Sequence, residues 1–137
     1  MKIFETEQDL VREKKAIEKF AEMKSFKFQK LDKLDIDYKI FDADGSHVGY
    51  AEVKGRIRFM RDAYPLPVSV AKIVKLLAKR TDCWLIWACD DGIIYGDPKD
   101  LVGEIKWGGM TPRPGSYNDL ELMAYYHKQK AIRYVRY

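Results

Sequence analysis

The chain has 137 residues, of which 47% are hydrophobic and 34% are charged. This length suits one domain, residues 1–137, with a continuous core, and the composition excludes both a disordered chain and a membrane protein. The net charge of +4 is a mild basic excess, which permits binding to a polyanion such as nucleic acid without demonstrating it.

The cellular location is indicated by the N-terminus and the cysteines. The N-terminal segment contains no apolar signal core, and no apolar run is long enough to span a bilayer. The only cysteines, Cys83 and Cys89, are too few for a disulfide framework and would lie roughly 20 Å apart on one extended strand. We therefore expect an intracellular, cytoplasmic protein with two reduced, buried thiols.

Residues 6–24 are predicted to form a helix. Thr6 and Asp9 have the spacing of a capping box, and apolar residues recur at helical spacing: Leu10, Ile17, Phe20 and Ala21. Glu13 falls inside this apolar stripe, where a carboxylate is costly unless it is paired, hydrogen-bonded or near a metal. It either bends outward, pairs with a lysine or serves a site. The next segment, 26–31, alternates apolar and polar residues as a half-buried strand does.

The stretch DIDYKIFDADGSHVGYAEVKGR (35–56) is predicted to form a hairpin. The dipeptide Asp44-Gly45 suits the positive φ angles of a tight two-residue turn. Counting outward from that turn sets Asp37 opposite Glu52. The hairpin therefore predicts two facing carboxylates.

The same register sets Asp35 opposite Lys54, so that the two pairs project from one face of the sheet. Two facing carboxylates repel each other, and at least one pKa rises unless a cation or strong hydrogen bonds compensate. A hard divalent ion such as Mg²⁺ is the natural compensator, since it is bound through a few carboxylate oxygens. The alternative is a solvated face of acids and lysines.

The second half of the chain begins with Pro65 and Pro67, which are expected to close the hairpin region. Ser69 is predicted to cap a helix that runs to about Arg80. The expected buried stripe of this helix consists of Val70, Ile73, Val74 and Leu77, and the opposite face carries Lys72, Lys75 and Lys79.

The segment CWLIWAC (83–89) has the continuous apolar character of a central strand, and IIYG after DDG suggests a return strand. The Gly- and Pro-rich segment 108–116 is predicted to be a loop, and the aromatic tail is expected to add strands at a sheet edge. The predicted order of elements is α-β-β-β-α-β-β.

These motifs resemble the PD-(D/E)XK nuclease superfamily, which includes restriction endonucleases, Holliday-junction resolvases and small phage nucleases. DIDY stands at the position of the strand aspartate, and AEVKGR stands at the acid-x-lysine position, after a helix that bears Glu13. The resemblance covers about residues 6–96 and implies an α/β fold. Its αβββαβ core has a central mixed β-sheet flanked by helices, with extra C-terminal strands in about 97–137.

Two features of the sequence depart from the family pattern. Ile36 stands where the family has a proline before the aspartate, and Asp35 and Asp37 compete for the aspartate position. Asp37 is preferred because the turn sets it opposite Glu52, and because the family aspartate is usually followed by an aromatic or aliphatic residue, here Tyr38.

The resemblance implies a deoxyribonuclease that depends on Mg²⁺ or Mn²⁺, most simply an endonuclease. Asp37, Glu52 and the backbone carbonyl of Val53 would ligate the ion, which would polarise the scissile phosphate and acidify the attacking water. Lys54 would orient or deprotonate that water and stabilise the transition state. Glu13 would bind a second ion or hold water in the outer shell.

Several further residues are candidates for contacts with DNA. Arg56, Arg58 and Arg61 could grip phosphates, although a solvated basic loop explains them equally well. Ser69 and Lys72 resemble a polar pair that small family members carry near the active site; a helix cap and a surface lysine are the alternative.

The remaining candidate, Arg113, lies in the Gly- and Pro-rich loop, which could insert into DNA or seal a dimer. Cleavage of both strands needs two active sites, which makes a homodimer attractive. The alternatives to a nuclease are a non-catalytic nucleic-acid-binding module that retains the fold and a structural subunit that assembles through its aromatic tail.

Overall fold

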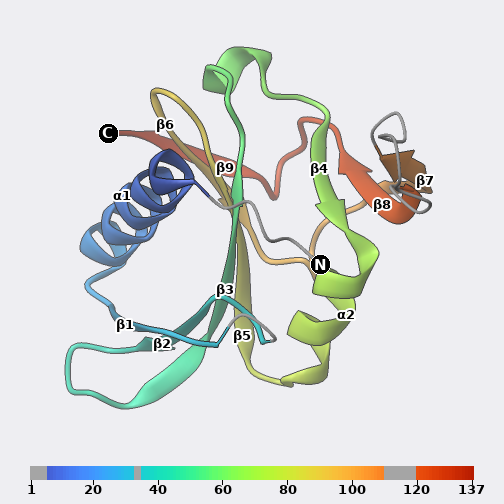
Figure 1. Ribbon diagram of the computed structural model, residues 1–137. Coiled ribbons are helices and arrows are strands. Elements are labelled where there is room, and N and C mark those ends of the chain that lie inside the picture. Colours follow the sequence, from blue (N-terminus) through green and yellow to red (C-terminus); the bar gives the residue numbers. More distant parts are fainter. Residues whose placement is uncertain (1–5, 33–34, 110–119) are drawn as a thin grey trace.

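The computed structural model describes residues 6–32, 35–109 and 120–137. The described residues form a mixed α/β fold with a six-stranded sheet, a three-stranded sheet and two α-helices (Figure 1). The helices are α1 (Glu7–Lys24), α2 (Val70–Ala78) and a short 3₁₀ helix, η1 (Met60–Asp62). The strands are β1 (Lys27–Lys30), β2 (Tyr38–Phe41), β3 (His47–Gly55), β4 (Leu66–Ser69), β5 (Asp82–Ala88), β6 (Gly92–Gly96), β7 (Glu104–Gly109), β8 (Leu120–Tyr126) and β9 (Arg133–Arg136).

The large sheet has the strand order β1-β2-β3-β5-β6-β9, and the small sheet has the order β4-β8-β7. Among these pairs only β3 and β5 run parallel. Helix α1 covers one face of the large sheet, while α2 and the small sheet lie on the other side (Figure 1). The predicted mixed α/β fold with extra C-terminal strands is confirmed, with β4 as an additional strand before α2.

Helix α1 begins where the sequence predicts. The Thr6 hydroxyl accepts a hydrogen bond from the Asp9 N–H at 3.1 Å, and the Asp9 carboxylate accepts one from the Thr6 N–H at 3.1 Å. The buried residues of α1 pack on the large sheet: Ala16, Ile17, Phe20 and Ala21. This packing holds α1 against β3, β5 and β6.

The turn between β2 and β3 differs from the predicted two-residue turn. The Asp42 carboxylate accepts hydrogen bonds from the N–H groups of Asp44 and Ser46, which builds a wider loop. The register then shifts by one residue next to the loop, and Tyr38 pairs with Ala51. Because the shift compensates for the wider loop, the predicted register holds at the end of the hairpin where the acids lie.

Strand β4 was not predicted, because Pro65 and Pro67 flank or interrupt it. It lies at one edge of the small sheet, where a proline needs no ladder partner for its missing N–H. The Trp87 indole N–H donates a hydrogen bond of 2.8 Å to the Pro67 carbonyl. This contact joins the centre of the large sheet to the small sheet.

Helix α2 begins at the predicted cap, since the Ser69 hydroxyl accepts a hydrogen bond from the Lys72 N–H at 3.3 Å. The predicted buried stripe is only partly right. Leu76 is buried and Ile73 packs against the core, whereas Val74 and Leu77 are exposed. The helix is therefore rotated about its axis relative to the prediction, and its lysines are placed differently as a result.

Both cysteines are buried and free, as predicted. Burial raises the pKa of Cys83 to about 11 and that of Cys89 to about 12. The two thiols are therefore protonated and unreactive near neutral pH. In the ranges that the structure describes, neither helix has the length and apolar character needed to cross a bilayer.

Candidate active site

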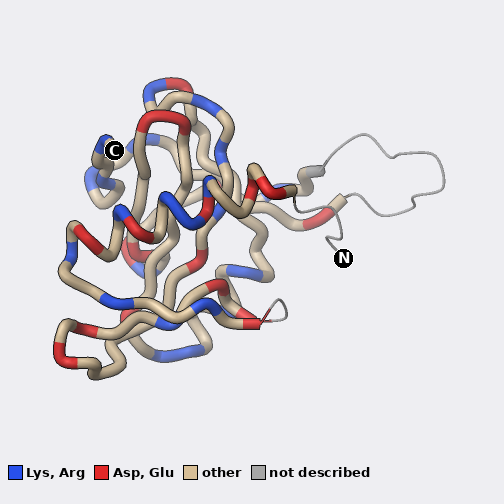
Figure 2. Tube along the Cα trace, turned by 60° about the vertical axis from the view of Figure 1, so that its left-hand side comes forward, with Lys and Arg blue, Asp and Glu red and all other residues tan. Residues whose placement is uncertain are grey.

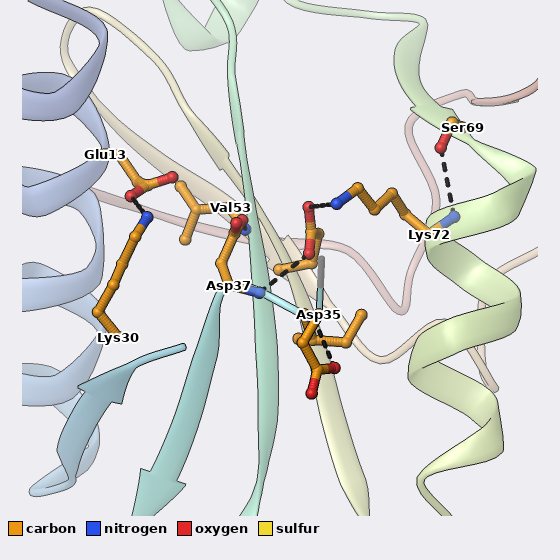
Figure 3. A network of polar contacts seen from close by, with 9 residues as sticks. Glu13, Lys30, Asp35, Asp37, Val53, Ser69 and Lys72 are labelled. Carbon is orange, nitrogen blue, oxygen red and sulfur yellow. Dashed lines mark hydrogen bonds and ion pairs between the residues drawn. The ribbon is translucent and has the colours of Figure 1, made fainter. Parts of the chain in front are cut away.

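The predicted acid pair comes together where β2 begins beside the middle of β3. Asp37 immediately precedes β2, and Glu52 lies on β3. The Glu52 carboxylate accepts a hydrogen bond of 3.2 Å from the Asp37 N–H, and the Asp37 carboxylate accepts one of 2.8 Å from the Val53 N–H. These reciprocal contacts hold both carboxylates at the same end of the hairpin, and Figure 3 shows Asp37 beside Val53.

Burial makes the negative charge of this pair costly. Glu52 is only 6% exposed, and it is the one charged residue among the buried residues that the structure describes. The pKa of Glu52 is raised to about 8, chiefly by burial and then by the nearby Asp37 carboxylate, while Lys72 opposes the rise. Burial also raises the pKa of Asp37, as does the charge of Glu13, against the effect of the Val53 N–H. The pair thus has an environment that a bound cation would relieve.

Lys72 reaches this pair from α2. Its Nζ lies 3.6 Å from Glu52 Oε2, and the side chain crosses from the helix toward β3 (Figure 3). The apolar pattern of the helix predicts Lys72 on the outer face, which is wrong. The signal that could have found it is its spacing of four residues from the buried Leu76, since residues at i and i+4 share a helix face.

Glu13 approaches from α1, on the other side of the sheet from Lys72 (Figure 3). Its carboxylate forms an ion pair with Lys30 and accepts a hydrogen bond of 2.8 Å from the Tyr38 hydroxyl. Of the alternatives left open by the sequence, pairing with a lysine is the one observed. Lys30 and Tyr38, from β1 and β2, are site residues that the sequence pattern does not indicate.

Asp35 is not part of the acid pair. The ladder of β2 and β3 starts at Tyr38, so Asp35 lies outside it, and the predicted pairing of Asp35 with Lys54 is wrong. The Asp35 carboxylate instead lies 3.0 Å from Lys79 Nζ and accepts a hydrogen bond from the Ile36 N–H. These contacts, the Ile36 N–H first, lower the pKa of Asp35. Asp37 is therefore the aspartate that meets Glu52.

Lys54 follows Glu52 by two positions on β3. Because side chains alternate along a strand, Lys54 projects from the same face of the sheet as Glu52. Its side chain is exposed, and it pairs in register with Trp87 of β5. The amine is thus placed at the solvent side of the site.

The predicted DNA-contacting arginines lie in different settings. Arg56 donates hydrogen bonds to the carbonyls of Ala63 (2.9 Å) and Pro65 (3.4 Å), which ties the segment after β3 to the start of β4. Arg58 and Arg61 are exposed, and Arg61 Nε lies 3.6 Å from Asp62.

The rest of the charge is dispersed. Along α1, acidic and basic residues are interspersed (Figure 2), so this helix is no basic stripe. The further candidate Arg113 lies outside the described residues.

The donor set of the site suits a hard cation. Within the described ranges no three His, Cys, Asp or Glu side chains are grouped to hold a metal ion, so a cation here would rely on the two carboxylates of Asp37 and Glu52. Mg²⁺ is commonly bound through one or two carboxylates while it keeps several waters. The N–H and C=O of one strand residue point to the same neighbouring strand, so the Val53 carbonyl is directed toward Asp37. The residues present fit Mg²⁺ or Mn²⁺.

The raised pKa of Glu52 predicts how stability depends on pH. The ordinary pKa is 4.5 and the folded value is about 8, so the folded state binds the proton more tightly. This contribution to stability is present below about pH 4.5 and is lost as the pH rises through about 8. In Glu52→Gln, where no proton is lost, we expect a free energy of unfolding about 1–3 kcal/mol above wild type at pH 9.

Urea unfolding of both proteins from pH 5 to pH 9 measures this difference. Millimolar Mg²⁺ should raise the stability of wild type at pH 9 and leave the variant unchanged, because a ligand stabilises only a state that binds it. Parallel pH profiles for the two proteins would contradict the assignment of the raised pKa to Glu52.

Comparisons of this chain with models of protein families, with curated proteins and with solved structures found no match. The paired carboxylates and their surrounding lysines are thus the basis for assigning a function to the chain.

Proposed function

We propose that this chain is a metal-dependent nuclease that hydrolyses DNA phosphodiester bonds, most simply an endonuclease of the PD-(D/E)XK type acting in the cytoplasm. The supporting observation is the pair formed by the buried Glu52 and the half-buried Asp37, whose carboxylates are held together by backbone N–H groups. Like charges held this close are costly in a buried setting. A cation bound by the two carboxylates would offset this cost, so the arrangement is suited to a metal site.

In this proposal, Asp37, Glu52 and the Val53 carbonyl hold Mg²⁺ or Mn²⁺. When bound, such an ion supplies positive charge beside the scissile phosphate and lowers the pKa of water. The chain's own residues then position the reactants. Lys54 projects from the face of Glu52 and is exposed, so its amine can hold the attacking water or stabilise charge that develops on the phosphate.

The positive charge of Lys72 partly compensates the negative charge of the Asp37–Glu52 pair. Its ammonium lies 3.6 Å from Glu52 Oε2 and lowers the cost of ionising that carboxylate. If Glu52 ligates a cation, Lys72 would be able to pair with a phosphate of the substrate instead. The Glu13–Lys30 pair shapes the same site from the α1 side, because the charges of both residues act on the pKa of Asp37.

The substrate's backbone phosphates are expected to meet Arg58 and Arg61. Both side chains are exposed in the segment that follows β3, and β3 is the strand that carries Lys54. Contacts of this kind make binding strongly dependent on salt concentration.

The test of the proposed function uses the purified chain with supercoiled plasmid, a branched DNA junction, single-stranded DNA and RNA. Each is incubated with Mg²⁺, with Mn²⁺ or with EDTA. We expect cleavage of DNA that needs the metal and falls by about 100-fold or more in Lys54→Ala. The matched control is Lys128→Ala, which removes an exposed lysine after β8 and should cleave at the wild-type rate.

The other outcomes identify the rival functions. A gel shift without cleavage indicates a non-catalytic nucleic-acid-binding module. Neither shift nor cleavage indicates a structural subunit. Equal cleavage by wild type and Lys54→Ala would point to a contaminating nuclease.

A further inference from the structure

Strand β7 lies at the outer edge of the small sheet (Figure 1). On one side it pairs with β8, and no strand of the described residues pairs with its other side. Its outward N–H and C=O groups are a template for another strand.

One face of this edge is apolar and exposed. Ile105 and Trp107 of β7 pair in register with Ala124 and Leu122 of β8, so these side chains share a face of the sheet. Toward β4 this face is part of the core, where Ala124 is buried. At the β7 end it extends past the core, and Ile105 is 60% exposed, Trp107 70% and Leu122 38%. The core face therefore continues into an uncovered apolar surface, which marks an interaction site.

The opposite face of β7 carries charges that determine which strand can pair with its free edge. Glu104 and Lys106 project from this face, with Lys106 Nζ 3.5 Å from Glu104 Oε1. If β7 pairs antiparallel with a second β7, a register centred on Ile105 sets Glu104 of each copy opposite Lys106 of the other. A register centred on Lys106 sets two lysines opposite each other, and one centred on Glu104 sets two glutamates opposite. Opposite charges across a ladder stabilise it and like charges destabilise it.

We propose that β7 pairs with β7 of a second copy of this chain about a two-fold axis at Ile105. Such an interface is isologous, with the same patch on both subunits. The two small sheets then form one continuous sheet. Both apolar surfaces lie on the same side of it, where Ile105 meets its own counterpart and the exposed residues of the two copies cover one another.

Charge reversal tests two points together: that the partner of β7 is a second β7, and that the two strands pair in the register centred on Ile105. Glu104→Lys or Lys106→Glu alone sets like charges opposite each other twice in the dimer, so we expect each to weaken dimerisation by about 10-fold or more. The double variant with both reversals restores opposite charges across the interface and within each strand. It should dimerise within about threefold of wild type. Sedimentation equilibrium measures the dissociation constants.

The control for charge alone is Glu121→Lys, which reverses an exposed charge on the same sheet face but on the inner strand β8. This variant should remain dimeric. Thermal unfolding of each variant at low concentration shows that the subunit itself is folded.

A cross-link tests the axis directly. In Ile105→Cys the two introduced thiols face each other at a separation that suits a disulfide, and mild oxidation should give a covalent dimer. Cys83 and Cys89 are each 1% exposed, so they do not compete. A chain that is monomeric at all concentrations, a double reversal that fails to restore the dimer, or cross-linking of Lys106→Cys in place of Ile105→Cys would each overturn the proposal. None of these measurements depends on nuclease activity.

Discussion

Replacing Glu52 by glutamine is expected to lower the rate of DNA cleavage by at least about 10³-fold while the chain remains folded. Glutamine keeps the size of the side chain and an oxygen that accepts from the Asp37 N–H, but it removes the charge that attracts a cation. Because Glu52 is buried beside Asp37, removing one of two repelling charges should stabilise the apo protein above about pH 8, where Glu52 is ionised. Loss of activity with gain of stability is the pattern of a functional residue.

Two measurements check this prediction. Initial rates of plasmid cleavage at saturating Mg²⁺ give the loss of activity, and titration calorimetry with Mn²⁺ gives the loss of metal binding. Asp37→Asn should behave like Glu52→Gln. The matched control is Asp35→Asn, because Asp35 pairs with Lys79 outside the acid pair; it should retain cleavage and Mn²⁺ binding. Wild-type rates in Glu52→Gln, or a larger loss in Asp35→Asn than in Asp37→Asn, would show that the site is elsewhere.

Truncating Trp87 to alanine is expected to lower the free energy of unfolding by about 3–5 kcal/mol. The side chain is fully buried at the centre of the large sheet, and the centroid of its ring lies 6.0 Å from the ring centroid of Tyr126 on β8. Its N–H also satisfies the partly buried Pro67 carbonyl of β4, and leaving that carbonyl without a donor adds to the cost. The substitution thus loosens the packing between the two sheets.

Urea unfolding monitored by circular dichroism measures this loss. Trp87→Phe separates the two contributions, since it keeps most of the ring packing and loses the N–H; we expect a loss of about 1–2 kcal/mol. A loss below about 1 kcal/mol in Trp87→Ala would mean that the two sheets are held together by other contacts.

The elements that were predicted correctly are those whose signals lie close together in the chain. The capping box of Thr6 and Asp9 requires only three residues of separation, and the apolar run of β5 is continuous. The pairing of Asp37 with Glu52 was also predictable, because the two strands are adjacent and the register shift compensates for the wider loop. Local chemistry was sufficient for these features.

The partners of the acids were decided by tertiary structure. The apolar pattern of α2 permits more than one rotation about its axis, and packing buries Leu76 while leaving Val74 and Leu77 exposed. That rotation turns Lys72 toward Glu52 and Lys79 toward Asp35. The sequence shows neither contact, because the acids come from a hairpin whose position relative to α2 depends on the folded sheet.

The sequence by itself therefore determined the mixed α/β fold, the start of α1, the central strand and the meeting of two carboxylates. Only the tertiary structure decided that β4 belongs to a second sheet, that Glu13 binds Lys30 and Tyr38, and that Lys72 of α2 faces Glu52. The physical reason is the separation along the chain over which each interaction acts. Caps, turns and strand alternation act over a few residues, whereas the rotation of a helix and the partner of a buried charge depend on residues that are distant in the chain and meet only on folding.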